Sequence, residues 1–431
     1  MERYERYKDS GVKWIGEIPE HWGMYKLKYL FKLNKNKNIG NKCNTILSLS
    51  YGKIKIKKDL NEGLTPESYE SYQLLSTGDI VIRSTDLQND HTSLRTGLVK
   101  IEGAITSAYI GLKNLDKNLY DSRFYHYFLH DWDITKAIYN QGKGLRQSLN
   151  WDDIKNMLIP VLDISEQTAI ANYLDSTTAK LDEAIAQQQK MIDLLNERKQ
   201  IIINNAVTKG LNPDAPMKDS GVDWIGEIPE HWEVMKLKHV TSKIGSGSTP
   251  RGGAEVYQDS GIMFLRSQNV YNDGLKLDDV AHIVDGVHQK MKGTQVKYND
   301  ILYNITGGSI GRCCCYDRED EANVNQHVSI VRPKGIIAKY LMYNLQSDNA
   351  QRQLRETLKG GNREGLAAVT FKEFLILTCP KEEQNQIVSH IERMFVNIDR
   401  AISNATKQIS LLQERKQIII NDVVTGKVKV S

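Results

Sequence analysis

Two stretches of the sequence place their apolar residues along one helical stripe. Between residues 170 and 202 the apolar positions advance by 4, 7, 4, 7, 3 and 7, and between residues 387 and 419 they advance by the same steps. Steps that are sums of three and four keep side chains on one face of an α-helix. Neither stretch contains proline or glycine, so each predicts an unbroken amphipathic helix of roughly 40 residues, about 60 Å long. The stripe residues are Ile170, Leu174, Leu181, Ile185, Ile192, Leu195 and Ile202 in the first helix and Ile387, Ile391, Ile398, Ile402, Ile409, Leu412 and Ile419 in the second.

A helix of this length has to bury its apolar stripe against a partner, because helix propensity alone does not stabilise it. The matched stripes favour a mutual seam, in which the two helices form an antiparallel coiled coil. The alternative is that each helix packs on its own globular domain or on another protein.

The chain also repeats the start of each half. "DSGVKWIGEIPEHW" at 9–22 returns as "DSGVDWIGEIPEHW" at 219–232, and 17 of the 21 positions from Lys8 to Lys28 recur at an offset of 210. A repeat of more than 200 residues is far longer than a solenoid unit of about 20–50 residues. Each copy is therefore a domain-sized half, and the sequence predicts a pseudo-twofold plan. We expect Trp14, Trp22, Trp224 and Trp232 to serve this frame, either by packing each half onto the helices or by offering a docking face to a partner.

The segments between the repeated ends share little sequence. Residues 24–160 and 233–380 both contain short β-rich runs such as "DIVIRS" and "VSIVRP", glycine-marked turns and a few helical stretches. The predicted fold class is α+β: two mixed α/β recognition domains held apart by two long antiparallel coiled-coil helices. The expected divisions are 1–163, first domain with its arm; 164–210, first helix; 211–380, second domain with the repeated arm; and 381–431, second helix. We expect length changes at 206–213, the joint between the halves, to alter the separation of the two domains.

Composition and charge indicate the class of protein and the compartment in which it acts. The sequence has 40% hydrophobic and 26% charged residues, a net charge of +4 and five cysteines, which is ordinary globular composition without a disulfide framework. The start, MERYERYKDS, lacks the apolar stretch of a signal peptide, and no apolar run reaches the length of a membrane span, so we expect a cytoplasmic protein. Ten lysines and no acid lie between Gly23 and Lys58. That stretch is either a phosphate-facing surface or a solvated loop with a lysine-rich edge strand.

Several motifs together resemble a known family. They are the repeated "DSGVxWIGEIPEHW", "GSGSTP" at 245–250 followed by "YQDSGIMFLRSQNV", "YNDILYNITGGSIGR" at 298–312, the "LNWDDIKNMLIP" that precedes Glu166-Gln167, and the two "ERKQIII" helices. This order of motifs, over the whole chain, resembles the specificity subunit of type I restriction-modification systems.

The resemblance implies a division of labour. Each variable segment would read one half of a bipartite site in double-stranded DNA, and the two helices would form the spacer between the half-sites. Two modification subunits would methylate adenine at N6 with S-adenosylmethionine, and restriction subunits, where the system includes them, would add Mg- and ATP-dependent cleavage. The present chain would bind no cofactor and catalyse nothing.

The residues agree with a non-catalytic chain. An N6-adenine methyltransferase needs a Pro-Pro-aromatic motif for the flipped base, and a P-loop needs G-x-x-x-x-G-K-[ST]; neither occurs in the sequence. Cys313, Cys314 and Cys315 are adjacent, whereas structural zinc ligands are spaced about two to four residues apart, so no metal site is expected. The alternative function is a coiled-coil scaffold whose two globular heads bind proteins or other ligands.

Base-reading residues are expected on loops, where Arg can reach guanine and Asn or Gln can reach adenine. The candidates are Arg83, Gln88, Lys143, Arg146 and Gln147 in the first half, and Thr249, Arg251, Arg266, Gln268, Asn269, Asn362 and Arg363 in the second. For each of them a turn or a surface ion pair is the alternative role.

Overall fold

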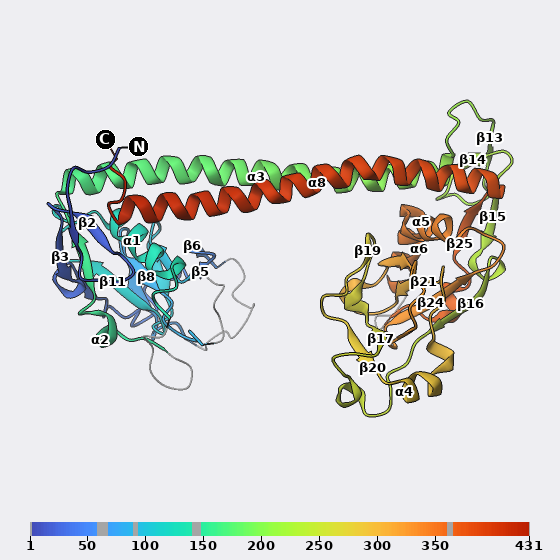
Figure 1. Cartoon of the computed structure of the whole chain (residues 1–431), viewed down its shortest axis with the longest axis horizontal. Coiled ribbons are helices and arrows are strands. Elements are labelled where there is room, and N and C mark those ends of the chain that lie inside the picture. The colour runs from blue at the N-terminus through green and yellow to red at the C-terminus, as the bar shows by residue number, and fades with distance from the viewer. Residues whose placement is uncertain (1, 58–67, 89–93, 140–147, 360–364, 431) are drawn as a thin grey trace. The chain divides into compact units, whose positions relative to one another are not determined.

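The computed structural model describes residues 2–57, 68–88, 94–139, 148–359 and 365–430. The chain divides into two compact units (Figure 1). Unit 1 comprises residues 1–189 and 406–431, and unit 2 comprises residues 190–405. Two long helices, α3 (Ile164–Lys209) and α8 (Lys381–Val424), contribute one part to each unit. At 46 and 44 residues they confirm the predicted long helices.

The remaining elements of unit 1 are short. They are β1 (Tyr7–Asp9), β2 (Glu17–Pro19), β3 (Gly23–Lys26), β4 (Phe31–Leu33), β5 (Leu47–Ser50), β6 (Lys53–Ile56), β7 (Gln73–Leu75), β8 (Ile80–Ile82), β9 (Thr96–Leu98), β10 (Gly103–Ile105), β11 (Ile110–Asn114), α1 (Ser122–Ile134), α2 (Trp151–Ile154) and β12 (Leu158–Val161).

Unit 2 has a similar sequence of elements. They are β13 (Met217–Asp219), β14 (Glu227–Pro229), β15 (Glu233–Lys236), β16 (Thr241–Ser246), β17 (Ile262–Leu265), β18 (Val270–Tyr271), β19 (Gly274–Leu275), β20 (Ala281–Ile283), α4 (Asp285–Lys290), β21 (Ile301–Asn304), β22 (Cys313–Cys315), β23 (Ala322–Val324), β24 (Val328–Pro333), α5 (Ala338–Gln346), α6 (Asp348–Lys359), α7 (Ala368–Phe371) and β25 (Leu375–Thr378).

The two variable segments contain the same central sheet despite their different sequences. Its strand order is β4-β11-β8-β9 in unit 1 and β16-β24-β21-β22 in unit 2, with antiparallel pairing throughout. Leu112 pairs with both Leu33 and Ile80, and Val331 pairs with both Ile244 and Ile301. These registers make Leu112 the structural counterpart of Val331, so positions in the two units can be matched through the sheet.

The two inner strands of each sheet are buried on both faces, which explains their continuous apolar runs. In unit 2, Cys313 and Cys315 belong to one apolar cluster and Cys314 to another, because successive strand residues point to opposite faces. The three adjacent cysteines are therefore core residues of β22.

A buried aspartate occupies the same turn in both sheets. The carboxylate of Asp79 accepts from the backbone N–H of Ser76 at 2.9 Å, and that of Asp300 accepts from Lys297 at 2.7 Å. Burial raises the pKa of Asp79. Arg332 donates twice to Asp300, at 2.7 Å each, and these hydrogen bonds raise the pKa of the guanidinium. Gly78-Asp79-Ile80 and Asn299-Asp300-Ile301, which share the sequence Asp-Ile, thus form one repeated turn.

Within each unit the two long helices pack antiparallel. In unit 1, Lys416 on α8 binds Asp182 on α3 at 2.5 Å, and the last turn of α8 shares an apolar cluster with the first turns of α3. In unit 2, Lys199 on α3 binds Asp399 at 2.7 Å and stacks over Phe395, while Gly210 after α3 lies near Glu383 at the start of α8. All fourteen stripe residues are buried or half-buried.

A repeated glutamate ties each arm to a helix start. Glu166 on α3 accepts hydrogen bonds from the indole N–H of Trp22 at 3.2 Å and from the hydroxyl of Tyr4 at 2.7 Å, and its second oxygen lies 2.9 Å from Nε2 of His21. In unit 2 the counterpart, Glu383, makes the same contacts with Trp232 at 3.1 Å and His231 at 2.7 Å.

The neighbouring glutamine ties the recognition domain to the same helix turn. The side chain of Gln167 accepts from the backbone N–H of Asp121, the N-cap of α1, and donates to the carbonyl of Leu162. Gln384 accepts from the backbone N–H of Ile337, the N-cap of α5, and donates to the carbonyl of Cys379. Each Glu-Gln pair therefore fixes the arm on one side and the first helix of the recognition domain on the other.

Each arm also covers the end of the opposite helix. Gly426 ends α8 with φ +74°, and a Cβ there would lie 2.3 Å from Pro19. Gly210 ends α3 with φ +71°, and a Cβ would lie 3.3 Å from Trp232. Both positions need glycine for the left-handed helix cap, and Gly426 needs it also for the close approach. We call the set of arm, Glu-Gln pair and terminal glycine the clasp. Trp22 and Trp232 are fully buried in the clasp, which confirms the packing interpretation of the repeated motif for these two residues, whereas Trp14 and Trp224 are half-buried.

Among the described residues, no helix is both long enough and apolar enough to cross a membrane.

Replacing Leu174 by Ala should lower the free energy of unfolding by about 2–5 kcal/mol, since this side chain is fully buried in the cluster that joins α3 to α8 in unit 1. Leu411→Ala is the matched control on α8, because that leucine is 54% exposed and its loss should change the free energy by less than about 0.5 kcal/mol. Urea unfolding of the purified chain, followed by circular dichroism, measures both. Equal losses would contradict the helix packing described for unit 1.

Candidate nucleic-acid interface

Unit 1 carries a lysine-rich surface along its first strands. Seven lysines between residues 24 and 58 are exposed, namely Lys26, Lys32, Lys35, Lys37, Lys42, Lys53 and Lys55, while Lys28 and Lys57 are half-buried and Lys58 lies outside the described residues. Lys53 and Lys55 lie on β6, which pairs with β5 in a two-stranded hairpin, and Lys53 reaches Asp182 at 3.6 Å. The lysine-rich hairpin strand is confirmed. That the surface faces phosphates stays a prediction.

A buried arginine shapes the loop that holds Arg83 and Gln88. The guanidinium of Arg95 is fully buried and donates to the carbonyls of Thr85 at 2.8 Å and Asp86 at 3.1 Å. Arg83 itself is half-buried in this loop, with its backbone N–H bonded to the carbonyl of Arg95 at 2.7 Å, and Gln88 is exposed. Arg95 was not among the sequence candidates, because a buried arginine that binds carbonyls has no local sequence signature.

Five of the sequence candidates lie outside the described residues. They are Lys143, Arg146 and Gln147 in unit 1 and Asn362 and Arg363 in unit 2. Their role as base contacts stays a prediction.

In unit 2, three candidates converge on Asp279. Arg266 donates to its carbonyl at 3.0 Å and Gln268 donates to its carboxylate at 2.6 Å. Asn269 is 2% exposed; its amide donates to the carbonyls of Lys276 and Asp279, and its oxygen accepts from the backbone N–H of Arg266. The geometry gives Asn269 the role of closing a turn, while Arg266 and Gln268 lie at the surface of that turn.

Thr249 and Arg251 are exposed on the glycine-rich loop that follows β16. This loop meets the turn between β23 and β24, where the hydroxyl of Thr249 donates to the amide oxygen of Gln326. Gln326 is exposed, and no sequence signal marked it, because a short polar turn between two β-rich runs looks like an ordinary hairpin connection.

The matching turn in unit 1 is also polar but uses different residues. Through the sheet register, Ser107 corresponds to Gln326, and the loop after β4 corresponds to the loop after β16. Here Lys37 donates to the hydroxyl of Ser107 at 2.7 Å and to the carbonyl of Ser71 at 3.2 Å. Both units therefore bring the same two loops together, with different hydrogen-bonding groups at the contact.

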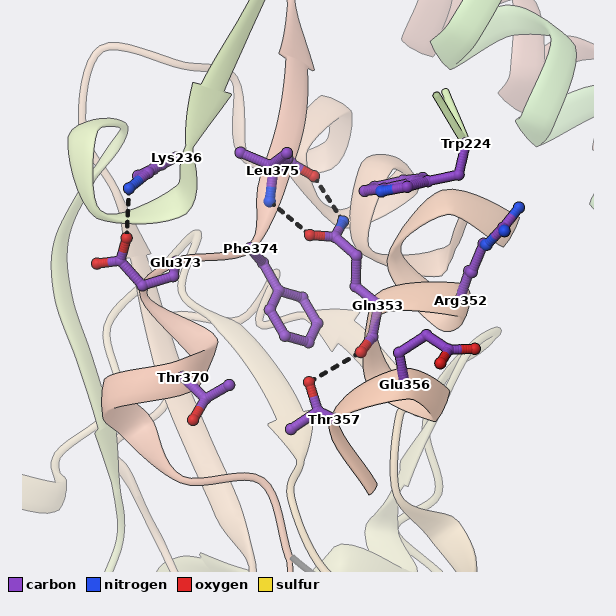
Figure 2. Close-up of a pocket in the computed structure, with 10 residues that line it drawn as sticks. All are labelled: Trp224, Lys236, Arg352, Gln353, Glu356, Thr357, Thr370, Glu373, Phe374 and Leu375. Atoms are coloured by element: carbon purple, nitrogen blue, oxygen red, sulfur yellow. Dashed lines mark hydrogen bonds and ion pairs between the residues drawn. The ribbon is translucent and has the colours of Figure 1, made fainter. Parts of the chain in front are cut away.

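A hollow of about 500 Å³ lies elsewhere in unit 2, between the arm, α6 and the β15–β25 pair (Figure 2). Gln353 holds the backbone of Leu375 with two hydrogen bonds, at 2.8 and 2.9 Å. Glu373 binds Lys236 and Lys238 at 2.7 Å each, and these bonds lower the pKa of its carboxyl to about 2. Trp224 of the arm lines the hollow in unit 2, whereas its counterpart Trp14 contacts Phe128 in unit 1. The hollow therefore belongs to the packing of the arm on its domain.

The described residues contain no group of three or more His, Cys, Asp or Glu side chains that could hold a metal ion. Burial raises the pKa of Cys314 and of Cys315 to about 12, so both thiols are protonated at neutral pH.

Comparison with known proteins places both halves of the chain in one family. The family model of the type I restriction modification DNA specificity domain matches residues 19–193 and again residues 229–410. The chain is 26% identical over 454 residues to the putative type I restriction enzyme MjaX specificity subunit of Methanocaldococcus jannaschii, with 98% of each chain covered. It is 24% identical over 324 residues to the type I restriction enzyme EcoBI specificity subunit of Escherichia coli, covering 73% of this chain and 68% of that protein.

A solved structure shares the fold. It is described as "Structural basis underlying complex assembly and conformational transition of the type I R-M system", and it matches with a TM-score of 0.65 at 14% identity, over 95% of this chain and 99% of that one. The likeness confirms the predicted fold class.

Asn269→Ala should lower the free energy of unfolding by about 1–3 kcal/mol, because it removes the acceptor for the backbone N–H of Arg266 and the amide donor to the carbonyls of Lys276 and Asp279, of which only that of Asp279 keeps a bond from Arg266. Gln268→Ala removes only an exposed hydrogen bond to the same Asp279 and should cost less than about 0.5 kcal/mol. Denaturant midpoints of the two variants measure the difference. A neutral Asn269→Ala would mean that this amide does not close the turn.

Proposed function

Because this chain belongs to the family of type I restriction-modification DNA specificity subunits, we propose that it selects the DNA sites at which partner subunits methylate adenine at N6. The observation that carries the proposal is the double match of the specificity domain, once in each unit, on two copies of the same sheet and clasp. We further propose that each unit reads one half of a bipartite site in double-stranded DNA.

The contrast between constant and variable contacts supports two different half-sites. The clasp contacts of Glu166 recur at Glu383, and those of Gln167 recur at Gln384. At the matching loop contact, however, unit 1 uses a lysine with a serine and unit 2 a threonine with a glutamine. A common frame with different polar groups at one place is suited to reading different base pairs in the same manner.

The two long helices are proposed to set the gap between the half-sites. Each helix is continuous, and α3 would be about 69 Å long at about 1.5 Å per residue. Each unit clasps one end of α3 and the opposite end of α8, so the length of the helices is the natural determinant of separation. The proposal places the determinant of the gap in the helices and not in a joint at 206–213, since Ala206 and Val207 are buried in the helix packing whereas residues 211–214 are exposed beyond the clasped glycine.

The proposal assigns the chemistry to other chains. Two modification subunits would bind S-adenosylmethionine, restriction subunits would bind Mg and ATP in a system that also cleaves, and this chain would catalyse nothing. We propose that it acts in the cytoplasm, where chromosomal DNA is accessible and the five described thiols, none of which forms a disulfide, stay reduced.

Deleting the gene for this chain should abolish N6-methyladenine at one bipartite motif of the host genome. Single-molecule sequencing of the wild-type and deletion strains measures the methylation, and restoring the gene on a plasmid is the control. The scaffold alternative predicts no motif that depends on this chain, so unchanged methylation in a strain that expresses the modification subunit would reject the proposed function.

Lengthening both helices should widen the gap without changing the bases read. Seven residues inserted after Gln189 on α3 and seven after Ala405 on α8, where the two units divide, would add about 10 Å, or about three base pairs at 3.4 Å each. Two glycines inserted in the exposed link 211–214 are the control and should leave gap and half-sites unchanged. A lengthened variant that methylates the original motif would rule out the helices as the spacer.

A further inference from the structure

Two loops of unit 2 are locked together at the end of the central sheet. The backbone N–H of Gly247 donates to the carbonyl of Val328 at 2.9 Å, and that of Ser248 donates to Val324 at 3.2 Å. A Cβ at position 247 would lie 2.0 Å from the carbonyl oxygen of Val324, so only glycine permits this approach. The turn that holds Gln326 is thereby fixed against the loop that holds Thr249.

A chain of side-chain hydrogen bonds then orients the amide of Gln326. Its oxygen accepts from the hydroxyl of Thr249, and its nitrogen lies 3.1 Å from the ring nitrogen Nε2 of His327. The amide nitrogen can only donate, so Nε2 is the acceptor and the neutral ring carries its proton on Nδ1. Nδ1 lies 2.6 Å from the hydroxyl oxygen of Thr306, which accepts the hydrogen bond from the Nδ1–H group.

The amide of Gln326 keeps part of its hydrogen-bonding capacity. An amide has two N–H donors and an oxygen with two lone pairs, and the contacts with Thr249 and His327 use one of each. The side chain is exposed, so one donor and one acceptor remain side by side and available. Adenine presents the complement in the major groove, an acceptor at N7 beside a donor at N6, whereas guanine presents two acceptors.

We propose that Gln326 reads an adenine in the half-site recognised by unit 2, with Thr249 and His327 as positioning residues that hold its amide. The inference rests on the proposed DNA-reading function and deepens it. The matching place in unit 1 supports it, because Lys37 and Ser107 there offer different hydrogen-bonding groups. Residues that read different bases in the two half-sites have to differ between the units, whereas residues that only hold the fold do not.

The test compares methylation motifs in the host that carries the full set of subunits. Gln326→Ala should relax one base pair of one half-site, lowering the preference for A·T at that position by about 5-fold to 150-fold, which is the usual worth of a bidentate base contact. The other half-site and the gap should not change. Gln326→Glu keeps the size of the side chain but offers only acceptors, so the same position should turn against adenine and towards cytosine, which presents a donor.

Two further variants separate positioning from stability. Thr249→Val removes the hydroxyl that holds the amide and should relax the same base pair, whereas Thr249→Ser keeps a hydroxyl and should restore the preference. Gln289→Ala is the matched control, because Gln289 is an exposed glutamine of the same unit whose amide donates to Asp285 on its own helix. It should leave the motif unchanged.

If a variant loses methylation in the cell, competition binding by the assembled complex tests the inference instead. The competing duplexes carry each of the four base pairs at every half-site position. Weakening confined to one position supports the inference. Equal weakening at all positions would show a contact with the phosphate backbone and overturn it. A wild-type motif that no Gln326 variant alters overturns the inference alone, while a wild-type chain that directs no methylation overturns the proposed function and the inference with it.

Discussion

The architecture depends on two adjacent side chains at the start of each long helix. Glu166 and Glu383 accept hydrogen bonds from the tryptophan indoles of the arms. Gln167 and Gln384 accept hydrogen bonds from the backbone at the first helix of each recognition domain. Both glutamines are buried, so an unpaired amide there would carry the full desolvation penalty of a buried polar group. One helical turn thus fixes both the arm and the recognition domain of each unit to a long helix.

Such a junction separates what can vary from what cannot. The central sheet keeps its strand order in both units although its sequence differs, because its buried strands require only apolar residues of suitable size, and many different apolar residues meet that requirement. Residues at the strand ends are free of that requirement. The pairs Lys37 with Ser107 and Thr249 with Gln326 occupy one place in the fold and differ in the hydrogen bonds they offer.

The frame was predictable from sequence to a large extent and the polar surface was not. The 3.6-residue periodicity gave both helices and their antiparallel packing, and the repeat at offset 210 gave the two halves. The shared sheet could not be predicted, because pairing between strands far apart in the chain leaves little trace in the sequence beyond short similarities such as the turns at Asp79 and Asp300. Asn269, which the sequence offered as a base contact, closes a turn. Gln326 could be identified only from its contacts with Thr249 and His327 in the structure. The sequence shows which loops are polar. It does not show which loops lie together, and a base contact depends on that arrangement.

The two units also differ in how the chain composes them. Unit 2 is one continuous segment, residues 190–405, whereas unit 1 joins residues 1–189 to residues 406–431. During synthesis on the ribosome, every part of unit 2 emerges before the last turn of α8, whose Ile420, Val423 and Val424 fill the apolar cluster around Ile170 and Leu174. The half that is made first is therefore the half that is finished last. Until the last turn of α8 has emerged, the part of α3 in unit 1 lacks the apolar surface that covers it, and the nascent chain has to be kept from aggregating through that uncovered stripe.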